Sequence, residues 1–330
     1  MVHRRTGSAC WYPDGVLLRA YIAVAGLLMR LLGGRPRRLL EEGPISLRYY
    51  SMGRRRGQGG ESWVLLHGLG SVGATWIPLI WALRRDCRVL VPELSSLGGT
   101  RSPGGGLTVD QGAAMTARLI EEELDGRPAT LVGLSLGGWM AVRLALSRPE
   151  LVARLVLVDP AGYRQQEWER IEKLVAIDDL AGVDRLYPAM FGRTPWMMRW
   201  SRGSFLRAYT SPGVRSVLGA LTEGDTYDQR DLARIEVPAA LIWGERDGIF
   251  KLETGRTMAA ALPRSRLYVL SGCGHAVHLE CPSSLVGAIR RFRAETLSTT
   301  ARVSLPAPAF PPAAAAETRP LFSPDRRGGS

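Results

Sequence analysis

The sequence predicts an α/β protein built on a doubly wound, mostly parallel β-sheet. Short apolar runs recur through the middle of the chain, each too short for a helix and apolar on both faces, as covered parallel strands are. Helical patterns such as residues 109–124 and 139–146 lie between most of them, an alternation typical of a parallel sheet covered by helices. The predicted strands are residues 63–66, 89–91, 130–132, 155–158, 239–243 and 267–270, and an earlier strand pair is expected to begin at "ISLRYYSMG" (45–53).

One interval is too long for a simple connection. About 80 residues separate the run that ends at 158 from the run that begins at 239, and a structureless loop of that length is unusual in a compact domain. We therefore expect a helical insertion over residues 162–234, which divides the core into residues 45–161 and 235–297. Residues 298–330 are rich in Ala and Pro and lack periodicity, so we expect a disordered tail there.

The 330-residue chain carries a net charge of +12, and its basic residues gather toward the two ends. No nucleic-acid-reading motif accompanies this charge, so we expect no nucleic-acid partner. The cysteines are Cys10, Cys87, Cys273 and Cys281; they form no C-x-x-C pair and lack zinc-site spacing. We expect isolated buried thiols.

The longest apolar stretch, residues 16–32, lies within a basic N-terminal segment, residues 1–44. A helix here would hold Arg19 and Arg30 on nearly the same face, with apolar side chains around the rest. It would extend about 25 Å, slightly short of a bilayer core. The helix could therefore lie in a membrane interface, or span it with both arginines snorkelling; packing on the protein itself or on a second subunit is the alternative.

These features predict a membrane surface as a partner, bound through residues 16–32. Because Arg35, Arg37 and Arg38 follow the segment closely, we expect a membrane-associated protein whose main domain is cytoplasmic. A soluble cytoplasmic protein is the alternative. The sequence leaves the oligomeric state open.

The pentapeptide Gly133-Leu134-Ser135-Leu136-Gly137 stands between a predicted strand and a predicted helix. A G-x-S-x-G turn at such a junction is sharp and strained, and it aims its serine out of the carboxyl edge of the sheet. Glycines two positions before and after the serine leave no Cβ to clash where strand and helix nearly touch. Ligands bind at this edge in α/β sheets, so we predict that Ser135 is a nucleophile.

A serine hydroxyl is a weak nucleophile until a base removes its proton. The chain has four histidines. His275 follows the predicted strand 267–270 through a short glycine turn, and His278, three residues later, is the alternative. His67 ends an early strand, and His3 lies in the basic N-terminal end. We therefore predict His275 as the general base.

The base needs a carboxylate that fixes its tautomer and stabilises its charged form. Asp247 follows the predicted strand 239–243, and Glu245 and Asp159 are alternatives because each also follows a predicted strand. We predict Asp247 as the acid. No cofactor and no metal is expected, since the H-x-x-H pattern at positions 275 and 278 is a weak zinc motif.

The resulting order of serine, aspartate and histidine is that of the α/β-hydrolases. Residues 45–297 resemble these enzymes through several motifs in register. "HGLG" (67–70) resembles the oxyanion loop, "LVPELSSLGGTRS" the loop after the next strand, "GLSLGG" the nucleophile turn, and "GERD" and "GCGH" the acid and base segments. The resemblance implies an α/β-hydrolase fold with a helical lid inserted after the sixth strand.

The resemblance also implies an oxyanion hole made by the backbone N–H groups of Leu69 and Leu136, which needs fixed amide donors and no particular side chain. His67 would then hold its loop by hydrogen bonds. The chain departs from the family pattern D-x-P-G-x-G-x-S, because Glu93 replaces the usual Asp and Ser95-Ser96 replaces Pro-Gly. We expect this departure to alter the pocket wall and to leave the triad unchanged.

A serine with such a base, acid and pair of amide donors performs acyl transfer through an acyl-enzyme. The insertion is rich in aromatic residues and Met, which make an adaptable apolar wall suited to an acyl chain. The chain resembles the membrane-anchored monoacylglycerol lipase and esterase branch and its bacterial lipase relatives, which implies hydrolysis of lipid-like carboxylic esters. The expected pocket residues are Trp139, Met190, Phe191, Trp196 and Met197.

Two alternatives stay open. Thioesterases and carbon–carbon bond hydrolases use the same triad, and Arg193, Arg199 and Arg202 of the insertion could clamp an anionic diketo acid. The other is a binding protein that keeps the fold without turnover, although an intact triad argues against it.

Overall fold

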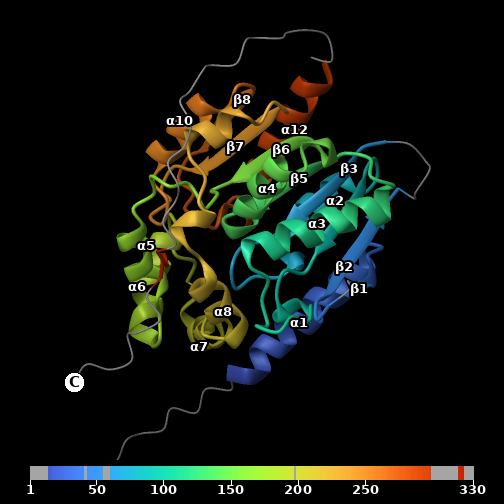
Figure 1. Ribbon diagram of the computed structural model, residues 1–330. Helices are drawn as coiled ribbons and strands as arrows, with labels where there is room; N and C mark the ends of the chain where they lie inside the picture. The colour runs from blue at the N-terminus through green and yellow to red at the C-terminus, as the bar shows by residue number, and fades with distance from the viewer. Residues whose placement is uncertain (1–13, 41–42, 55–59, 197, 299–318, 323–330) are drawn as a thin grey trace, which may run out of the picture.

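A single β-sheet forms the centre of the protein. The structure, a computed structural model, describes residues 14–40, 43–54, 60–196, 198–298 and 319–322 (Figure 1). The strands are β1 (Arg35–Leu40), β2 (Ser46–Gly53), β3 (Ser62–Leu66), β4 (Arg88–Pro92), β5 (Ala129–Leu134), β6 (Val152–Val158), β7 (Ala239–Gly244) and β8 (Ser265–Leu270). They form an eight-stranded sheet in the order β1-β2-β4-β3-β5-β6-β7-β8. β2 pairs antiparallel with β1 and with β4, and the remaining neighbours are parallel.

The apolar runs of the middle region all form strands, which confirms the predicted fold class. They become β3 to β8, and "ISLRYYSMG" contains β2. The sequence does not predict β1, because Arg35-Pro36-Arg37-Arg38 lacks the apolar pattern of a covered strand. β1 is an edge strand whose arginines are exposed, and edge strands tolerate both charge and proline.

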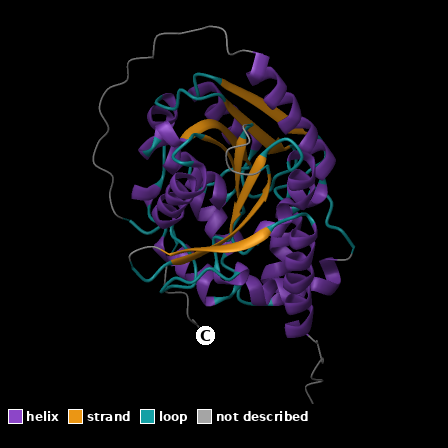
Figure 2. Cartoon of the chain, turned by 90° about the vertical axis from the view of Figure 1, so that its right-hand side faces the viewer, coloured by secondary structure: helices purple, strands orange, loops and turns teal. Residues whose placement is uncertain are grey.

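Helices cover both faces of the sheet (Figure 2). Outside the insertion they are α1 (Asp14–Leu31), α2 (Ile77–Leu83), α3 (Val109–Leu124), α4 (Leu136–Ser147), α10 (Leu252–Ala261), α11 (Val277–Glu280) and α12 (Pro282–Ser298). Successive strand residues face two different cores, since side chains alternate across a strand. In β3, Trp63 and Leu65 join the core with α2 and α12, whereas Val64 and Leu66 join the core with α3 and α4. Burial on both faces explains the continuous apolar sequences.

The inserted helices lie between β6 and β7, as predicted. They are α5 (Trp168–Val175), α6 (Leu180–Met190), α7 (Met198–Tyr209), α8 (Pro212–Ala220) and α9 (Gln229–Ala233). The end of α6 lies against the loops that follow β7 and β8: Gly248 N–H donates to the carbonyl of Ala189, and Ala276 N–H donates to that of Met190, each at 2.9 Å. The lid therefore covers the carboxyl edge of the parallel strands.

The N-terminal helix α1 packs on the body of the protein, beside lid helix α7 (Figure 1). Ala25 and Met29 are buried against the sheet side. Four large apolar side chains of α1 are exposed to solvent, and these are Val24, Leu27, Leu28 and Leu31. No helix within the described ranges has the length and apolarity needed to cross a bilayer.

The C-terminal tail returns to the lid at residues 319–322. The N–H of Leu321 donates to the carbonyl of Leu221 at 2.9 Å, and the ring of Phe322 meets that of Trp168 edge-on. Both tail side chains are buried. The prediction of a disordered tail over 298–330 is therefore wrong for residues 319–322, because the average composition of an Ala- and Pro-rich segment conceals two adjacent apolar side chains that can bury together.

Candidate active site

Ser135 sits in a strained turn between β5 and α4. Its backbone angles are φ 51° and ψ −117°, a region that residues with a side chain adopt only when their surroundings enforce it. The enforcing contacts are backbone hydrogen bonds: Ser135 N–H donates to Val158 (3.0 Å), and the Ser135 carbonyl accepts from Trp139 and Ala161 (both 3.1 Å). The serine is thus held at the carboxyl edge of the sheet, as the G-x-S-x-G motif predicts.

The glycines on either side of the serine permit this turn. A Cβ on Gly133 would lie 2.3 Å from the carbonyl oxygen of Gly137, and a Cβ on Gly137 would lie 2.4 Å from the carbonyl oxygen of Leu66. Backbone atoms cannot move aside as the tip of a flexible side chain can. Any larger residue at either position would push α4 away from β3 and β5.

His275 and Asp247 form a buried hydrogen-bonded pair on the loops that follow β8 and β7. His275 Nδ1 lies 2.8 Å from Asp247 Oδ2. The other carboxylate oxygen, Oδ1, accepts from the N–H groups of Ile249 (2.7 Å) and Phe250 (2.9 Å). Since the carboxylate accepts a proton at Nδ1, we assign the neutral ring as the Nδ1–H tautomer, which leaves Nε2 to act as a base.

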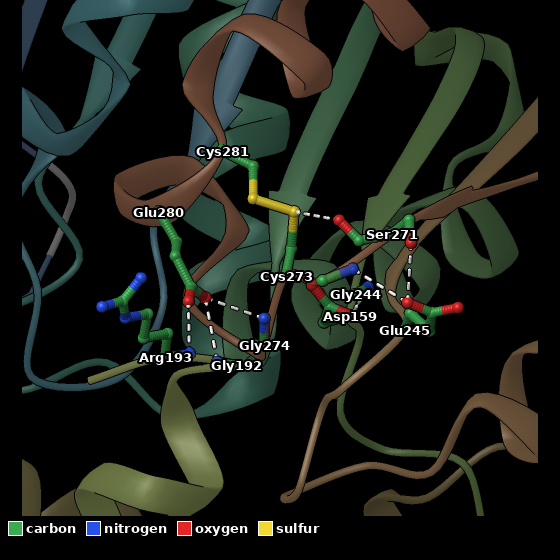
Figure 3. The surroundings of a disulfide bond; sticks show 11 residues. Asp159, Gly192, Arg193, Gly244, Glu245, Ser271, Cys273, Gly274, Glu280 and Cys281 are labelled. Carbon is green, nitrogen blue, oxygen red and sulfur yellow. Dashed lines mark hydrogen bonds between the residues drawn. A yellow bond between two sulfur atoms is a disulfide. The ribbon is translucent and has the colours of Figure 1, made fainter. Parts of the chain in front are cut away.

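The alternative bases and acids have other partners. Burial lowers the pKa of His278 to about 3, and its ring packs on Trp76. Glu245 accepts hydrogen bonds from Ser271 Oγ (2.8 Å) and Gly272 N–H (2.9 Å) in an exposed turn (Figure 3). Of the side chains that the sequence offered, the structure joins His275 to Asp247.

His67 has the structural role expected for it. Its Nδ1 lies 2.9 Å from the carbonyl oxygen of Gly68, and its Nε2 accepts from Leu94 N–H at 2.9 Å. Burial lowers the pKa of His67 to about 4, so the ring is neutral near pH 7. It ties the loop after β3 to the loop after β4.

The predicted oxyanion donors lie in segments that meet at the serine turn. Leu136 is the first residue of α4, so its N–H has no partner within the helix. A Cβ on Gly68 would lie 3.5 Å from the Cβ of Ser135, so the loop that contains Leu69 lies directly against the turn. This arrangement is compatible with two amide donors at one oxygen.

The predicted pocket residues fall into different environments. Met190 ends α6 and Phe191 follows it, beside the histidine loop, where a Cβ on Gly274 would lie 2.6 Å from the Met190 carbonyl oxygen. Trp139 packs in the core against Trp168 and donates its indole N–H to a backbone carbonyl, as a core residue does. Trp196 is 76% exposed and therefore forms no enclosed wall. Met197 lies outside the described residues.

The arginines considered as an anion clamp lie in different environments. The guanidinium of Arg202 forms an ion pair with Asp184 on α6, so its charge is already matched. Arg193 is exposed. The side chain of Arg199 lies outside the described part of the structure.

Cys273 and Cys281 form a disulfide, with 6.3 Å between their Cα atoms (Figure 3). The expectation of isolated thiols is therefore wrong for this pair and correct for Cys87, which is a buried free cysteine; Cys10 lies outside the described ranges. The spacing of eight residues matches no cysteine motif. The two sulfur atoms meet only after the chain turns at His275 and forms α11, so the sequence does not predict this pair. The disulfide thus closes the loop that carries the candidate base.

Glu280 is a residue beside the candidate site whose contacts the sequence does not predict. Its carboxylate accepts three backbone N–H bonds: from Arg193 (2.8 Å) and Gly192 (3.1 Å) of the lid and from Gly274 (2.8 Å) of the histidine loop (Figure 3). It therefore joins the lid to the residue before His275. No local pattern marks this role, because its partners come from a distant segment.

Asp159, Asp247 and His275 bring potential ligand atoms within 4.8 Å of one another. Within the described residues this is the group whose spacing could suit a metal ion. The hydrogen bond between Asp247 and His275 already engages the histidine nitrogen that would bind it. The cluster therefore has the geometry of an acid–base pair with a second carboxyl beside it.

The sheet, the inserted lid and the strained serine turn define an α/β hydrolase. The sequence pattern of the alpha/beta hydrolase family matches residues 63–288, and the chain belongs to this family. It is a hydrolase of the esterase and lipase type.

Two relatives and two solved structures illustrate the range of similar proteins. The chain is 30% identical over 245 residues to a pimeloyl-acyl-carrier-protein methyl ester esterase of Nitrosomonas europaea, covering 69% of this chain and 93% of that protein. It is 24% identical over 258 residues to the monoacylglycerol lipase ABHD6 of Bos taurus, covering 72% and 76%. A bacterial membrane phospholipase A has a TM-score of 0.71 at 21% identity, with 87% and 93% coverage. Carboxylesterase CesB of Bacillus subtilis has a TM-score of 0.70 at 19% identity, with 86% and 99% coverage; both structural likenesses show the fold.

We expect loss of the disulfide to destabilise the protein and to slow hydrolysis. Treatment with dithiothreitol, or the double substitution Cys273→Ser/Cys281→Ser, should lower the free energy of unfolding by about 2–3 kcal/mol, since a closed loop of roughly nine residues restricts the unfolded chain. The turnover number should fall as well, because the loop that holds His275 loses its covalent closure. Urea unfolding and hydrolysis rates measure the two effects.

The control for this test is Cys87→Ala, which should remain sensitive to dithiothreitol, whereas the double serine variant should not. Alkylation of the unreduced protein that modified both Cys273 and Cys281 would contradict the disulfide.

Glu93, the departure noted in the loop after β4, should make stability depend on pH. Its buried Oε2 accepts from Gly73 N–H at 3.0 Å, and burial raises its pKa from 4.5 to about 7. The Glu93 carboxyl loses its proton at lower pH in the unfolded chain than in the folded chain. The free energy of unfolding therefore falls as the pH rises from about 4.5 to about 7. Glu93→Gln stays neutral and should therefore be more stable than the wild type at pH 8, by up to about 3 kcal/mol.

Urea unfolding at pH 4 and pH 8 provides the measurement. The exposed carboxylate Glu253 gives the control, because Glu253→Gln should change stability little at either pH. An equal effect of Glu93→Gln at both pH values would show that folding leaves the pKa of Glu93 unchanged.

Proposed function

We propose that the protein hydrolyses carboxylic esters of lipid-like molecules through an acyl-enzyme on Ser135. His275 is the general base, Asp247 orients it, and the N–H groups of Leu69 and Leu136 stabilise the oxyanion. The observation that carries this proposal is the buried hydrogen bond between His275 Nδ1 and Asp247, on loops at the same sheet edge as the strained serine.

The reaction follows from these roles. Nε2 of His275 takes the proton of Ser135 Oγ as the oxygen attacks the ester carbonyl. The tetrahedral oxyanion receives hydrogen bonds from the two backbone amides, and the imidazolium then gives its proton to the leaving alcohol. Water, activated by the same nitrogen, attacks the acyl-enzyme and releases the acid. Asp247 stays ionised throughout and stabilises the charged imidazole.

An ester substrate is favoured over an anionic diketo acid. The Arg202 guanidinium, one member of the proposed clamp, is paired with Asp184. The relatives named as a methyl ester esterase and a monoacylglycerol lipase also support an ester. A thioester remains the nearest alternative, because the same acyl-enzyme would form from it.

We also propose that the protein binds a membrane surface through α1. Four apolar side chains of this helix face solvent, and Leu31 is 73% exposed. Three exposed arginines lie close to these side chains in the sequence: Arg30 on α1, and Arg35 and Arg38 on β1. Their positive charges would attract anionic lipid head groups. Lid helix α7 packs on α1 and exposes Trp200, so membrane contact would bring the lid close to the lipid.

Two observations bear on the compartment in which the main domain lies. The sequence predicts a cytoplasmic domain, whereas disulfides such as Cys273–Cys281 form and persist in oxidising compartments. Alkylation of Cys273 and Cys281 in intact cells would indicate a reducing compartment, and protection would indicate an oxidising one.

Ser135→Ala should abolish ester hydrolysis, with kcat reduced by about 10⁴-fold or more, because no acyl-enzyme can form. A panel of p-nitrophenyl esters and monoacylglycerols of increasing chain length, beside an acyl thioester, measures activity and preference. The exposed residue Ser283 gives the matched control, since Ser283→Ala should keep full activity and full labelling by a fluorophosphonate. Comparable turnover by folded Ser135→Ala would refute the acyl-enzyme.

Leu27→Asp/Leu31→Asp should weaken binding to vesicles of anionic phospholipid by about 10- to 100-fold, because two apolar side chains leave the lipid. Hydrolysis of a soluble short-chain ester should be unchanged, since the side chains of Leu27 and Leu31 face solvent. Vesicle sedimentation measures the binding. The control is Val269→Asp on edge strand β8, and equal binding by the α1 variant would exclude this face.

A further inference from the structure

Asp159 lies directly after β6 and beside the pair formed by His275 and Asp247. Its side chain is fully buried, and its φ of 42° is unusual for a residue with a side chain. Asp159 N–H donates to Ile242 O (3.0 Å), and Asp159 Oδ1 accepts from Gly244 N–H (2.9 Å), which ties the end of β6 to the end of β7 (Figure 3). Strain of this kind persists where the surrounding structure enforces it, and it concentrates at functional sites.

The second carboxyl oxygen of Asp159 has no such donor. Oδ2 is buried, and no N–H or O–H group in the described chain donates to it. The titratable side chains recorded around it are Asp247 and His275, whose ligand atoms lie within 4.8 Å of those of Asp159. The neighbour available to Oδ2 is therefore another carboxyl group.

Two carboxyl groups so close together in a buried space cannot both be ionised. Asp247 is the one that holds the charge, because it accepts from Ile249, Phe250 and His275. Asp159 accepts a single N–H bond, and burial together with the charge of Asp247 raises the pKa of Asp159 well above its ordinary value. Its proton is then available for a hydrogen bond.

We propose that Asp159 is a positioning residue for the reaction: a neutral carboxylic acid that donates a hydrogen bond to the carboxylate of Asp247. The inference rests on the proposed function, and it adds a fourth side chain to that site. Asp159 touches no reacting atom. It restrains Asp247 and draws off part of its negative charge, so it limits how strongly Asp247 holds the protonated form of His275.

A purely structural role would look different. If Asp159 served only to join β6 to β7 through Gly244, its loss would change stability and leave the pH profile of hydrolysis unaltered. If Asp159 were ionised, removing its charge would favour the neutral form of His275. The direction of the change in the pH profile therefore distinguishes the three cases.

The experiment compares Asp159→Asn and Asp159→Ala with the wild type, using kcat/KM for a short p-nitrophenyl ester as a function of pH. The amide of Asn is neutral, can accept from Gly244 and can donate to Asp247, so we expect kcat/KM within about threefold of the wild type and an unchanged acid limb. Alanine removes the donor, so we expect kcat/KM to fall by about tenfold or more and the acid limb to move to higher pH.

Two kinetic results would overturn the inference: an acid limb of Asp159→Asn that moves to lower pH, or a rate and profile of Asp159→Ala identical to the wild type.

Should the alanine variant not fold, infrared spectra decide. Both spectra are recorded in a Glu93→Gln background, since buried Glu93 is itself partly protonated at pH 7. The carbonyl band of a buried protonated carboxylic acid should be present when Asp159 is intact and absent in Asp159→Asn, and its absence with Asp159 intact overturns the proposal. This spectrum needs no turnover, so it tests Asp159 even if the protein hydrolyses none of the esters offered.

Discussion

The close approach of β5 to α4 at Ser135 is the constraint on which the rest of the site depends. Backbone atoms fill the space where Gly133 and Gly137 would carry side chains, so the turn has one conformation available. Hydrogen bonds from this turn reach Val158 and Ala161. They fix the end of β6 on both sides of Asp159, so one strained turn determines where the hydroxyl of Ser135 and the buried carboxyl of Asp159 lie.

The acid, the base and the lid form a second hydrogen-bonded unit. The carbonyls of Ala189 and Met190 at the end of α6 accept from the loops after β7 and β8, and Glu280 adds three bonds between the lid and the histidine loop. The disulfide closes the same loop. The position of the imidazole is therefore linked to the packing of the lid, although no lid residue belongs to the triad.

The electrostatics of the site follow from burial. Burial favours the neutral forms of His67, His278 and Glu93: it lowers the pKa of each histidine and raises the pKa of Glu93. Burial also raises the pKa of Asp159 and so favours its neutral form. The carboxylate of Asp247 accepts hydrogen bonds from the N–H groups of Ile249 and Phe250 and lies against His275 Nδ1. A buried carboxylate held by fixed hydrogen-bond donors among neutral neighbours is the arrangement that stabilises an imidazolium when it forms.

The sequence by itself determined what depends on local chemistry. Apolar runs revealed β3 to β8 because both faces of those strands are buried. The G-x-S-x-G turn and the following acid and base segments predicted which side chains meet at one sheet edge, because each motif ends its own strand. Tertiary structure alone decided what depends on distant partners. β1 can be a strand because it lies at the edge of the sheet. Cys273 meets Cys281 only after the loop between them turns. Glu280 and Asp159 form hydrogen bonds with groups supplied by the lid and by β7. Hydrogen bonds between segments far apart leave no periodic trace in the sequence, so only the folded chain shows them.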